Sequence, residues 1–339
     1  MRAYEVREAT EDYSGIVEVE RERPEPADDE VLINIRACSL NFRDLAIAHS
    51  ELQYRNTQLP TIPLSDGAGE VVEVGSHVER LSVGDRVATP FSPSWVAGDV
   101  SSTSLGSARG AGIDGALAEY AVYPAESVPK LPDHLSYEEG ATLPCAGLTA
   151  WHGLVENGDV RSGESVLLIG TGGVSTFGLQ FAKMHGADPF VISSSDEKLE
   201  RARELGATQT LNYQDTPEWG EAVQERTGGG VDHVIEVGGQ GTIQRSVEAA
   251  KLGGALHLIG VLSEPEEPFN PLSILGKGLT VQGVIAVGST EMFEHMNRAI
   301  EVNEMVPEVD RVFAFDEVQD AYRHQHAGKH HGNVVVSLE

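Results

Sequence analysis

The residues with the clearest chemical use form a glycine-rich turn: Gly170, Gly172, Gly173, Val174 and Ser175. The turn follows an apolar run at 166–169 and precedes the helix-like segment 177–185. Strand, glycine loop and helix in this order are typical of a dinucleotide site, because glycines let backbone amides approach a pyrophosphate and the helix N-terminus supplies positive potential. Ser175 stands where a third glycine is usual. The turn therefore predicts a bound dinucleotide.

The choice between NADP and NAD is expected at the end of the next strand, near residue 193. An acidic residue there accepts the ribose hydroxyls of NAD and repels the extra phosphate of NADP. The sequence has Ser193 and Ser194 at this place, with Lys198 one helical turn on. Neutral donors and a cation favour the phosphate, so we predict NADP. The alternative is NAD, with Lys198 solvated and Asp196 or Glu197 reaching the ribose.

Six apolar runs separated by helical segments predict a parallel doubly wound sheet. They lie at 166–169, 190–193, 209–212, 232–237, 255–260 and 279–285. Before them, residues 1–145 contain short alternating runs broken by Gly, Pro and Asp, which predict a twisted β-barrel. The final run, 333–338, is a strand that returns to the first domain in this interpretation. The fold class is α/β with a β-barrel domain.

The charge is strongly acidic, with 24 Lys and Arg against 53 Asp and Glu and a net charge of −29. Such a field repels nucleic-acid phosphates and anionic membranes, so neither is an expected partner. Only six of the cations are lysine. Acidic residues spread over the whole chain are typical of proteins from salt-accumulating organisms, where concentrated cations screen the repulsion. We therefore expect a halophilic surface.

The two cysteines, Cys38 and Cys145, form no CxxC pair and are too few for a disulfide framework. The N-terminal segment 1–10 lacks the apolar core of a signal sequence, and no apolar run is long enough to span a bilayer. These features predict a cytoplasmic protein.

Across nearly its whole length the sequence resembles the medium-chain dehydrogenase/reductase superfamily, which contains the zinc alcohol dehydrogenases and the quinone oxidoreductases. The resemblance lies in SLNFRDL (39–45), PLSDGAGEVVEVG (63–75), GDRV (84–87), GALAEYAV (115–122), ATLPCAGLTAW (141–151), GTGGVSTFGLQFAK (170–183) and KLERARELGAT (198–208). It implies a GroES-like barrel at 1–146 and 289–339 and a six-stranded Rossmann domain at 147–288.

The zinc enzymes of this superfamily hold a catalytic zinc with a cysteine, a histidine and a second cysteine. At these positions the sequence has Asn41, Ser65 and Cys145, so one thiolate remains. An amide and a hydroxyl are poor zinc ligands, and Asp66 beside them does not restore a set of three. The segment 92–115, where the structural zinc lobe is expected, contains no cysteine and predicts a long loop. The resemblance therefore implies the zinc-independent branch.

In that branch an asparagine lies near the nicotinamide and the substrate carbonyl, and Asn41 resembles it. Arg43 stands at the hydroxyl position of the zinc enzymes' proton relay, and we expect it either to supply a cation or to pair with Asp44 or Asp66. Asp44 is expected to order the loop. Tyr54 is a candidate proton donor, with water as the alternative. Cys145 is expected to be a small buried residue rather than a nucleophile.

Other residues are expected near the cofactor because of their place in the family pattern. Tyr213 resembles a tyrosine that contacts the NADP phosphate, and Asn333 stands where a Lys or Arg often contacts the cofactor. The nicotinamide and its ribose would be lined by Thr149, Val237, Gly238, Gly260, Val261, Val284 and Ile285. The alternative for the apolar members is a place in the core. The histidines 324, 326, 330 and 331 are expected to be solvated rather than metal ligands.

The strand-forming segment 279–287 is expected at a sheet edge, where it invites pairing with a second subunit. We therefore predict a homodimer, with a tetramer as the alternative. The predicted activity is NADPH-preferring, zinc-independent hydride transfer to a quinone, an α,β-unsaturated carbonyl or a related carbonyl compound. Two alternatives remain, a zinc-type alcohol dehydrogenase with a degenerate metal site and a non-catalytic protein that binds or senses NADPH.

Overall fold

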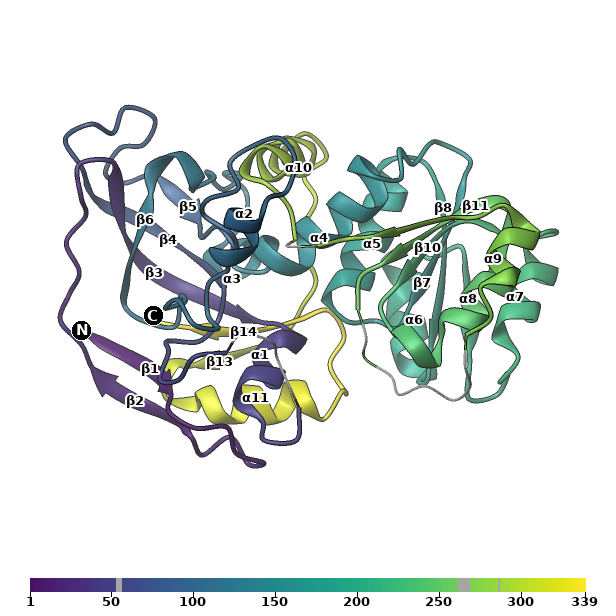
Figure 1. Cartoon of the computed structure of the whole chain (residues 1–339), viewed down its shortest axis with the longest axis horizontal. Coiled ribbons are helices and arrows are strands. Elements are labelled where there is room, and N and C mark those ends of the chain that lie inside the picture. The colour runs from purple at the N-terminus through teal and green to yellow at the C-terminus, as the bar shows by residue number, and fades with distance from the viewer. Residues whose placement is uncertain (53–56, 261, 263–268, 286) are drawn as a thin grey trace. The chain divides into compact units, whose positions relative to one another are not determined.

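The computed structural model describes residues 1–52, 57–260, 262, 269–285 and 287–339 (Figure 1). The chain divides into two compact units. Unit 1 contains Met1–Leu148 and Ala286–Glu339, and unit 2 contains Thr149–Ile285. In the described part of the chain, no helix is long and apolar enough to cross a membrane.

Unit 1 is built on β-strands, and its main sheet has the order β13-β14-β3-β4-β5, with β6 paired to β3. The last strand of the chain pairs antiparallel with β3, so the two ends of the sequence share one sheet. The strands are β1 (Arg2–Val6), β2 (Ile16–Glu20), β3 (Glu30–Leu40), β4 (Asp66–Val74), β5 (Arg86–Ala88), β6 (Tyr120–Pro124), β13 (Val309–Ala314) and β14 (Asn333–Ser337).

The hydrophobic core of unit 1 consists of the buried side chains of these strands and of helix α11 (Val318–His326). Ile33, Ile35 and Val71 are fully or almost fully buried there. The remaining helices are short, except for one at the carboxyl end. They are α1 (Phe42–Ala48), α2 (Ser102–Gly106), η1 (Ala125–Ser127), α3 (Tyr137–Gly140), η2 (Leu143–Gly147), α10 (Thr290–Val302) and η5 (Phe315–Glu317), and α4 (Leu148–Trp151) spans the boundary between the units.

The segment 92–115 is more regular than the loop predicted from its composition. It contains α2, whose N-cap Ser101 accepts a hydrogen bond from the Ser104 amide at 3.1 Å. The hydroxyl of Ser94 donates to that of Ser107 at 2.7 Å and to the Thr103 carbonyl at 3.0 Å. Serine hydroxyls thus satisfy the backbone of a segment whose sequence shows no apolar periodicity.

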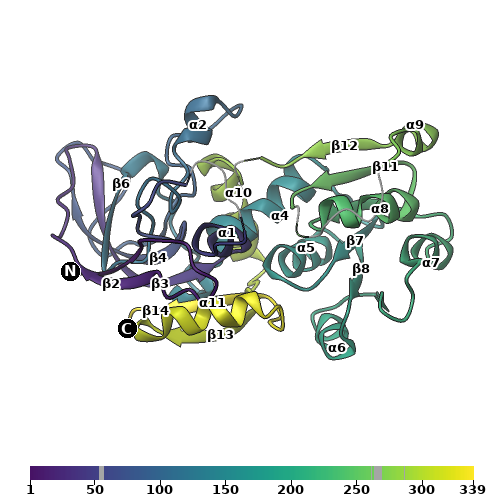
Figure 2. The same cartoon turned by 60° about the horizontal axis from the view of Figure 1, so that its bottom comes forward.

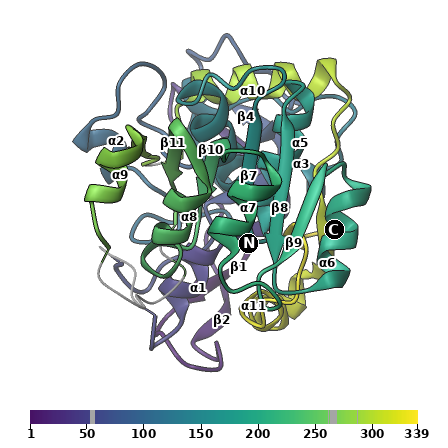
Figure 3. The same ribbon diagram turned by 90° about the vertical axis from the view of Figure 1, so that its right-hand side faces the viewer.

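Unit 2 is the predicted doubly wound sheet, and its six strands have the order β12-β11-β10-β7-β8-β9. Figure 3 shows β11, β10, β7, β8 and β9 of this sheet. All neighbouring strands are parallel, so the chain starts in the middle and winds to each edge in turn. The strands are β7 (Ser165–Ile169), β8 (Asp188–Ser193), β9 (Gln209–Asn212), β10 (Val231–Glu236), β11 (Ala250–Leu258) and β12 (Thr280–Gly283).

Helices connect these strands, as a parallel sheet requires. They are α5 (Gly173–Met184), α6 (Asp196–Glu204), α7 (Trp219–Arg226), η4 (Gly239–Gly241), α8 (Ile243–Ala249) and α9 (Leu272–Lys277), while η3 (His152–Glu156) precedes β7. Figure 2 shows β12 at one edge of this sheet beside β11. The edge position agrees with the prediction for 279–287.

Candidate active site

The glycine-rich turn has the geometry that a dinucleotide site needs. It connects β7 to α5, and Gly170 has φ of 78°, a conformation that favours glycine. Gly172 is the N-cap of α5 in extended conformation, so the first amides of the helix begin at Gly173 and Val174. The first four amides of a helix have no intrahelical acceptor, which makes this end suited to a phosphate.

The structure explains why Ser175 is tolerated in place of a third glycine. Its hydroxyl is buried and donates to the Ile169 carbonyl at 2.8 Å, so the added polar group is satisfied. Close packing of helix on strand is provided one turn later, at Gly178. A Cβ there would lie 2.6 Å from the Leu168 side chain.

The residues predicted to choose the cofactor meet at the end of β8. Ser193 is buried and its carbonyl accepts a hydrogen bond from the Tyr213 amide at 3.1 Å, whereas Ser194 is exposed. Lys198 lies in the first turn of α6 and is half-buried. Asp196 is one of the alternative ligands of the ribose. One of its carboxylate oxygens already accepts a hydrogen bond from the side-chain amide of Asn212 at 2.9 Å.

Most of the predicted nicotinamide-lining residues gather at the carboxyl ends of β10, β11 and β12. A Cβ on Gly260 would lie 2.3 Å from the Val237 carbonyl oxygen, and the Val284 amide donates to the Leu258 carbonyl at 2.9 Å. Ile285, at 51% exposure, is open to solvent, and Thr149 is buried at the start of unit 2. Val261, also in this set, lies outside the described residues, as does Tyr54.

Asn333 belongs to unit 1 and has an internal role. It is buried, and its side-chain amide donates to the Glu308 carbonyl at 2.9 Å. Its backbone amide donates to the same carbonyl at 3.1 Å. The asparagine therefore fixes the start of β14, which a Lys or Arg at this position would not do in the same way.

Asn41, Arg43 and Asp44 are brought together by the turn from β3 into α1. The Asn41 backbone amide donates to Asp44 Oδ2 at 2.8 Å, which supports the predicted role of Asp44 in ordering this turn. Arg43 is buried, lies 3.7 Å from Asp44 Oδ1 and stacks its guanidinium 4.7 Å from the centre of the Phe91 ring. The Asn41 side chain lies close enough to the Asp44 and Asp66 carboxyl groups to lower the pKa of both.

Ser65, Asp66 and Cys145 form a second polar group in unit 1. Asp66 is fully buried at the start of β4. Its Oδ1 accepts from the Ser65 hydroxyl at 2.5 Å and its Oδ2 from the Cys145 backbone amide at 2.9 Å. Both carboxylate oxygens are thus used by the residues at two of the metal-ligand positions of the zinc enzymes.

Burial dominates the electrostatics of these carboxyl groups. It raises the pKa of Asp66 to about 7, against the lowering effects of the Ser65 hydroxyl and the nearby Asn41 amide. It raises the pKa of Asp44 to about 6, against the attraction of Arg43. The neighbouring thiol of Cys38 is also buried, and its pKa lies well above the ordinary value. Burial in this part of unit 1 thus favours the protonated, uncharged forms of Asp44, Asp66 and Cys38.

Among the described residues, no group of three or more His, Cys, Asp or Glu side chains is placed to hold a metal ion. The predicted solvated histidines of the carboxyl-terminal region have particular contacts instead. The imidazole of His324 lies 2.7 Å from the Asp310 carboxylate. The imidazole of His326 forms a hydrogen bond of 2.8 Å with the Tyr13 hydroxyl. His331 is buried, and its imidazole lies 3.6 Å from the Glu308 carboxylate. The expectation that all four are solvated is therefore wrong for His331.

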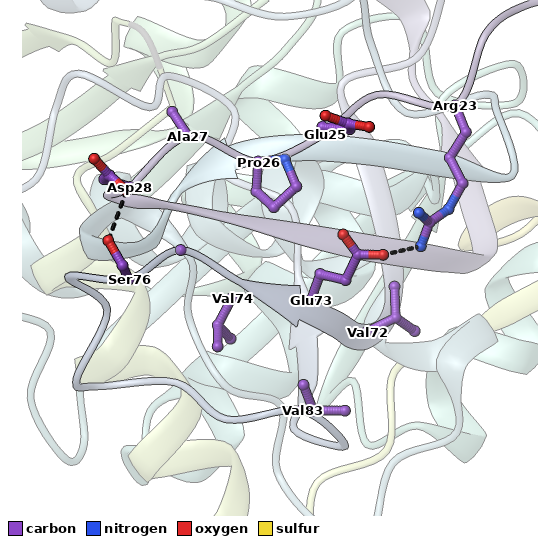
Figure 4. A pocket seen from close by; sticks show the side chains of 11 residues that line it. Arg23, Glu25, Pro26, Ala27, Asp28, Val72, Glu73, Val74, Ser76 and Val83 are labelled. Atoms are coloured by element: carbon purple, nitrogen blue, oxygen red, sulfur yellow. Dashed lines mark hydrogen bonds and ion pairs between the residues drawn. The ribbon is translucent and has the colours of Figure 1, made fainter.

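A groove of about 630 Å³ lies on unit 1, and none of the candidate site residues lines it (Figure 4). Four of its polar side chains are paired with one another. Arg23 forms an ion pair of 2.7 Å with Glu73, and Ser76 donates to Asp28 at 2.6 Å. The groove offers no reactive group and does not change the choice of site.

Sequence reasoning missed two buried polar groups in unit 2. Glu236, at the end of β10, has no exposed surface. His233 and His257 are hydrogen-bonded at 3.2 Å on neighbouring strands, and His233 also contacts Glu164 at 3.1 Å. The signal that could have found them is a charged or imidazole side chain inside an apolar strand, since such residues are rarely buried without partners.

Comparison with known proteins agrees with this architecture. The family model described as alcohol dehydrogenase GroES-like domain matches residues 27–133, and the one described as zinc-binding dehydrogenase matches 173–301. A zinc-type alcohol dehydrogenase-like protein of Schizosaccharomyces pombe is 43% identical over 91% of this chain and 91% of its own. The chloroplastic NADPH-dependent alkenal/one oxidoreductase of Arabidopsis thaliana is 30% identical over 96% of this chain and 77% of its own.

Among solved structures, a putative alcohol dehydrogenase from Sinorhizobium meliloti superposes with a TM-score of 0.91 at 35% identity. The match covers 99% of this chain and 98% of that one. Sequence, fold and motifs thus agree along the chain. The protein belongs to the medium-chain dehydrogenase/reductase family of oxidoreductases, in its alcohol dehydrogenase-like group.

Proposed function

We propose that the protein is an NADPH-preferring, zinc-independent reductase that delivers hydride to an α,β-unsaturated carbonyl compound, a quinone or a related carbonyl compound. The observation that carries this proposal is the hydrogen bonding of Asp66. Its two oxygens are taken up by the Ser65 hydroxyl and the Cys145 amide, where zinc enzymes of the family hold their metal.

A zinc ion does not fit this donor set. Catalytic zinc needs three protein ligands of the thiolate, imidazole or carboxylate type, and Asn41 and Ser65 provide an amide and a hydroxyl instead. The family model described as zinc-binding covers 173–301, a stretch that contains none of the three ligand positions. The proposed reaction therefore depends on the chain's own donors and on the cofactor.

A dinucleotide fits unit 2. The amides at the start of α5 would hold its pyrophosphate, and Ser194 with Lys198 would hold the 2′-phosphate of NADP, with Ser193 and Tyr213 beside them. NAD is the alternative, with Glu197 as its acidic ligand. NADPH supplies the hydride when bound.

Unit 1 supplies the polar groups that such a reduction needs. The Asn41 side-chain amide is a hydrogen-bond donor, and such a donor is suited to a carbonyl oxygen on which negative charge develops. Asp44 holds the Asn41 backbone, and Arg43 adds positive charge beside it. Water or Tyr54 would provide the proton.

Two alternatives carry less support. An alcohol dehydrogenase needs a metal or another strong acid at the Asn41, Ser65 and Cys145 positions. A non-catalytic NADPH-binding protein would differ in activity from a relative that is named an oxidoreductase. The name of the Arabidopsis relative, an NADPH-dependent alkenal/one oxidoreductase, favours reduction of a conjugated carbonyl.

The experiment is NADPH oxidation followed by absorbance in molar KCl with EDTA, against quinones, enones and saturated aldehydes, with secondary alcohols and NADP⁺ assayed in the reverse direction. Turnover of quinones or enones despite the chelator supports the proposal. Activity that appears only after zinc is added would support the alcohol dehydrogenase, and tight NADPH binding without turnover of any acceptor would support the sensing protein.

We also propose a homodimer of a cytoplasmic enzyme. The edge strand β12 leaves the backbone groups of one side unpaired within its sheet, and the neighbouring Leu272, Leu275 and Ile285 are exposed. A second copy of the same edge would satisfy both features, with a tetramer as the alternative. Light scattering in molar KCl should give the mass of two chains, and Gly283→Pro, at a position whose N–H faces away from β11, should reduce it to one. A monomeric wild-type protein would contradict this proposal.

A further inference from the structure

Glu236 is a buried carboxylate at the carboxyl end of β10, and four donors of one short segment surround it. Its Oε1 accepts from the Gly238 amide at 2.7 Å, the Gly239 amide at 2.9 Å and the Thr242 hydroxyl at 2.6 Å. Its Oε2 accepts from the hydroxyl of Ser246 on α8. The side chain has no exposed surface.

The backbone of the same residue holds a second segment. The Glu236 carbonyl accepts from the Ile259 amide at 2.9 Å and from the Gly260 amide at 3.3 Å, just beyond β11. Gly260 approaches so closely that a Cβ would lie 2.3 Å from the Val237 carbonyl oxygen. Glu236 therefore connects the two loops that follow neighbouring parallel strands.

The loop Val237–Thr242 depends on this carboxylate for its shape. Gly239 has φ of 81°, and a Cβ on Gly238 would lie 2.3 Å from Thr242 Oγ1, so the turn is tight. Burial of a carboxylate is strongly unfavourable unless hydrogen bonds replace its water. Conversely, the buried amides of this turn need an acceptor, which Glu236 provides. The carboxylate and the loop conformation stabilise each other.

We propose that Glu236 is a positioning residue for the cofactor: its carboxylate fixes Val237–Thr242 in the conformation that receives the nicotinamide half of NADPH. This inference rests on the proposed function, because it takes Val237, Gly238 and Gly260 as neighbours of that half. The adenosine half has its own residues at the end of β8 and at the glycine-rich turn, which Glu236 does not touch.

The test compares two ligands in Glu236→Gln by isothermal titration calorimetry. NADPH has both halves, whereas adenosine 2′,5′-bisphosphate has only the half expected at Ser194 and Lys198. Glutamine keeps the shape and one acceptor oxygen but loses the charge that strengthens these hydrogen bonds. We expect the Kd of NADPH to rise about tenfold and that of the bisphosphate to change less than about twofold. In turnover, the KM for NADPH should rise and the KM for the acceptor should not.

Two further variants keep the test decisive. Thr242→Val removes one donor with little change in volume and should weaken NADPH binding in the same selective way, by about threefold. Glu221→Gln makes the same chemical change at an exposed position of α7 and should alter neither ligand. Equal weakening of both ligands in Glu236→Gln, or unchanged NADPH binding in both Glu236→Gln and Thr242→Val, would overturn the positioning role. A wild-type protein that binds neither ligand would instead overturn the proposed function itself.

Discussion

In unit 1, burial raises the pKa of Asp66 to about 7 and that of Asp44 to about 6, whereas in unit 2 burial lowers the pKa of His257 to about 4. The shifts have opposite signs because burial disfavours whichever form is charged. The carboxyl groups of unit 1 therefore hold their protons to higher pH in the folded state. His257 of unit 2 binds its proton only at lower pH.

Asp66 and His257 consequently contribute to the acid response with opposite signs. Between pH 4 and 7 the folded form of unit 1 binds more protons than the unfolded chain, so Asp66 makes it less stable as the pH rises. Between pH 6.5 and 4 the unfolded form of unit 2 binds more protons at His257, so that unit loses stability as the pH falls. The buried groups, rather than the acidic surface, set these two dependences.

The largest expected effect is that of Asp66→Asn on the stability of the protein above pH 7. Asparagine keeps the shape, accepts from the Cys145 amide and donates to the Ser65 hydroxyl, but has no charge to bury. The shift of Asp66 from 3.8 to about 7 corresponds to about 4 kcal/mol at pH 8. Denaturant unfolding should show the variant more stable than wild type by up to that amount at pH 8 and equal to it at pH 4. A variant clearly less stable at pH 8 would contradict the role given to burial in unit 1.

The matching change in unit 2 is His257→Gln, which retains a hydrogen-bonding partner for His233. The shift of His257 from 6.5 to about 4 corresponds to about 3 kcal/mol. The variant should lose this part of the acid sensitivity, so its stability relative to wild type should rise as the pH is lowered from 7 to 4. Hydrogen exchange read separately for β10 and β11 measures it. An unchanged acid dependence would show that His257 is not the responsible group.

We also expect unit 2 to determine the preference for NADPH over NADH, and Ser193→Asp tests this expectation. An acid at the end of β8 would accept ribose hydroxyls and repel the 2′-phosphate, so the ratio of kcat/KM for NADPH over NADH should fall about 100-fold. Unit 1 should be unaffected, which unchanged KM for the acceptor would show. Lys198→Gln should lower the same ratio by a smaller factor. A ratio that stays constant in both variants would remove the assignment of the phosphate site.

The smallest expected effect separates surface charge from the buried groups. Raising KCl from about 0.1 to about 2 M should screen the repulsion among the surface carboxylates and stabilise the whole protein by roughly 1–2 kcal/mol. The pH dependences assigned to Asp66 and His257 should keep their positions, since salt screens buried groups much less. Thermal unfolding across a grid of pH and KCl checks both statements. Stability that does not rise with salt would contradict the halophilic surface.

The sheet of unit 2 was predictable because strand-like and helix-like segments alternate along the sequence. Its central strands β7 and β8 carry buried apolar runs, whereas the edge strands β9 and β12 are short and partly exposed. All six runs became strands, and the turn at Gly170 kept the local geometry that its glycines indicated. The assignment of Asn41, Asp44 and Asp66 to the site came from the family pattern and stays a prediction. These signals are local or depend on residue type alone.

What the sequence did not reveal depends on contacts between distant residues. The hydrogen bond from Cys145 to Asp66 joins positions 79 residues apart, and the pairing of His233 with His257 joins two different strands. Glu236 carries no local signal for its four donors, since their orientation follows from the tight turn after β10. The regular structure within 92–115 likewise depends on hydrogen bonds between serine hydroxyls and backbone groups. Composition alone predicts only a loop for this segment.

The central claim is hydride transfer to a conjugated carbonyl or quinone without zinc, and metal content measured on active enzyme tests it most directly. The protein is dialysed against EDTA in molar KCl, its zinc is determined by mass spectrometry, and the same sample is assayed with NADPH and an enone or quinone. We expect full turnover with far less than one zinc per chain. Turnover that vanishes with the zinc and returns in proportion to added zinc would contradict the claim.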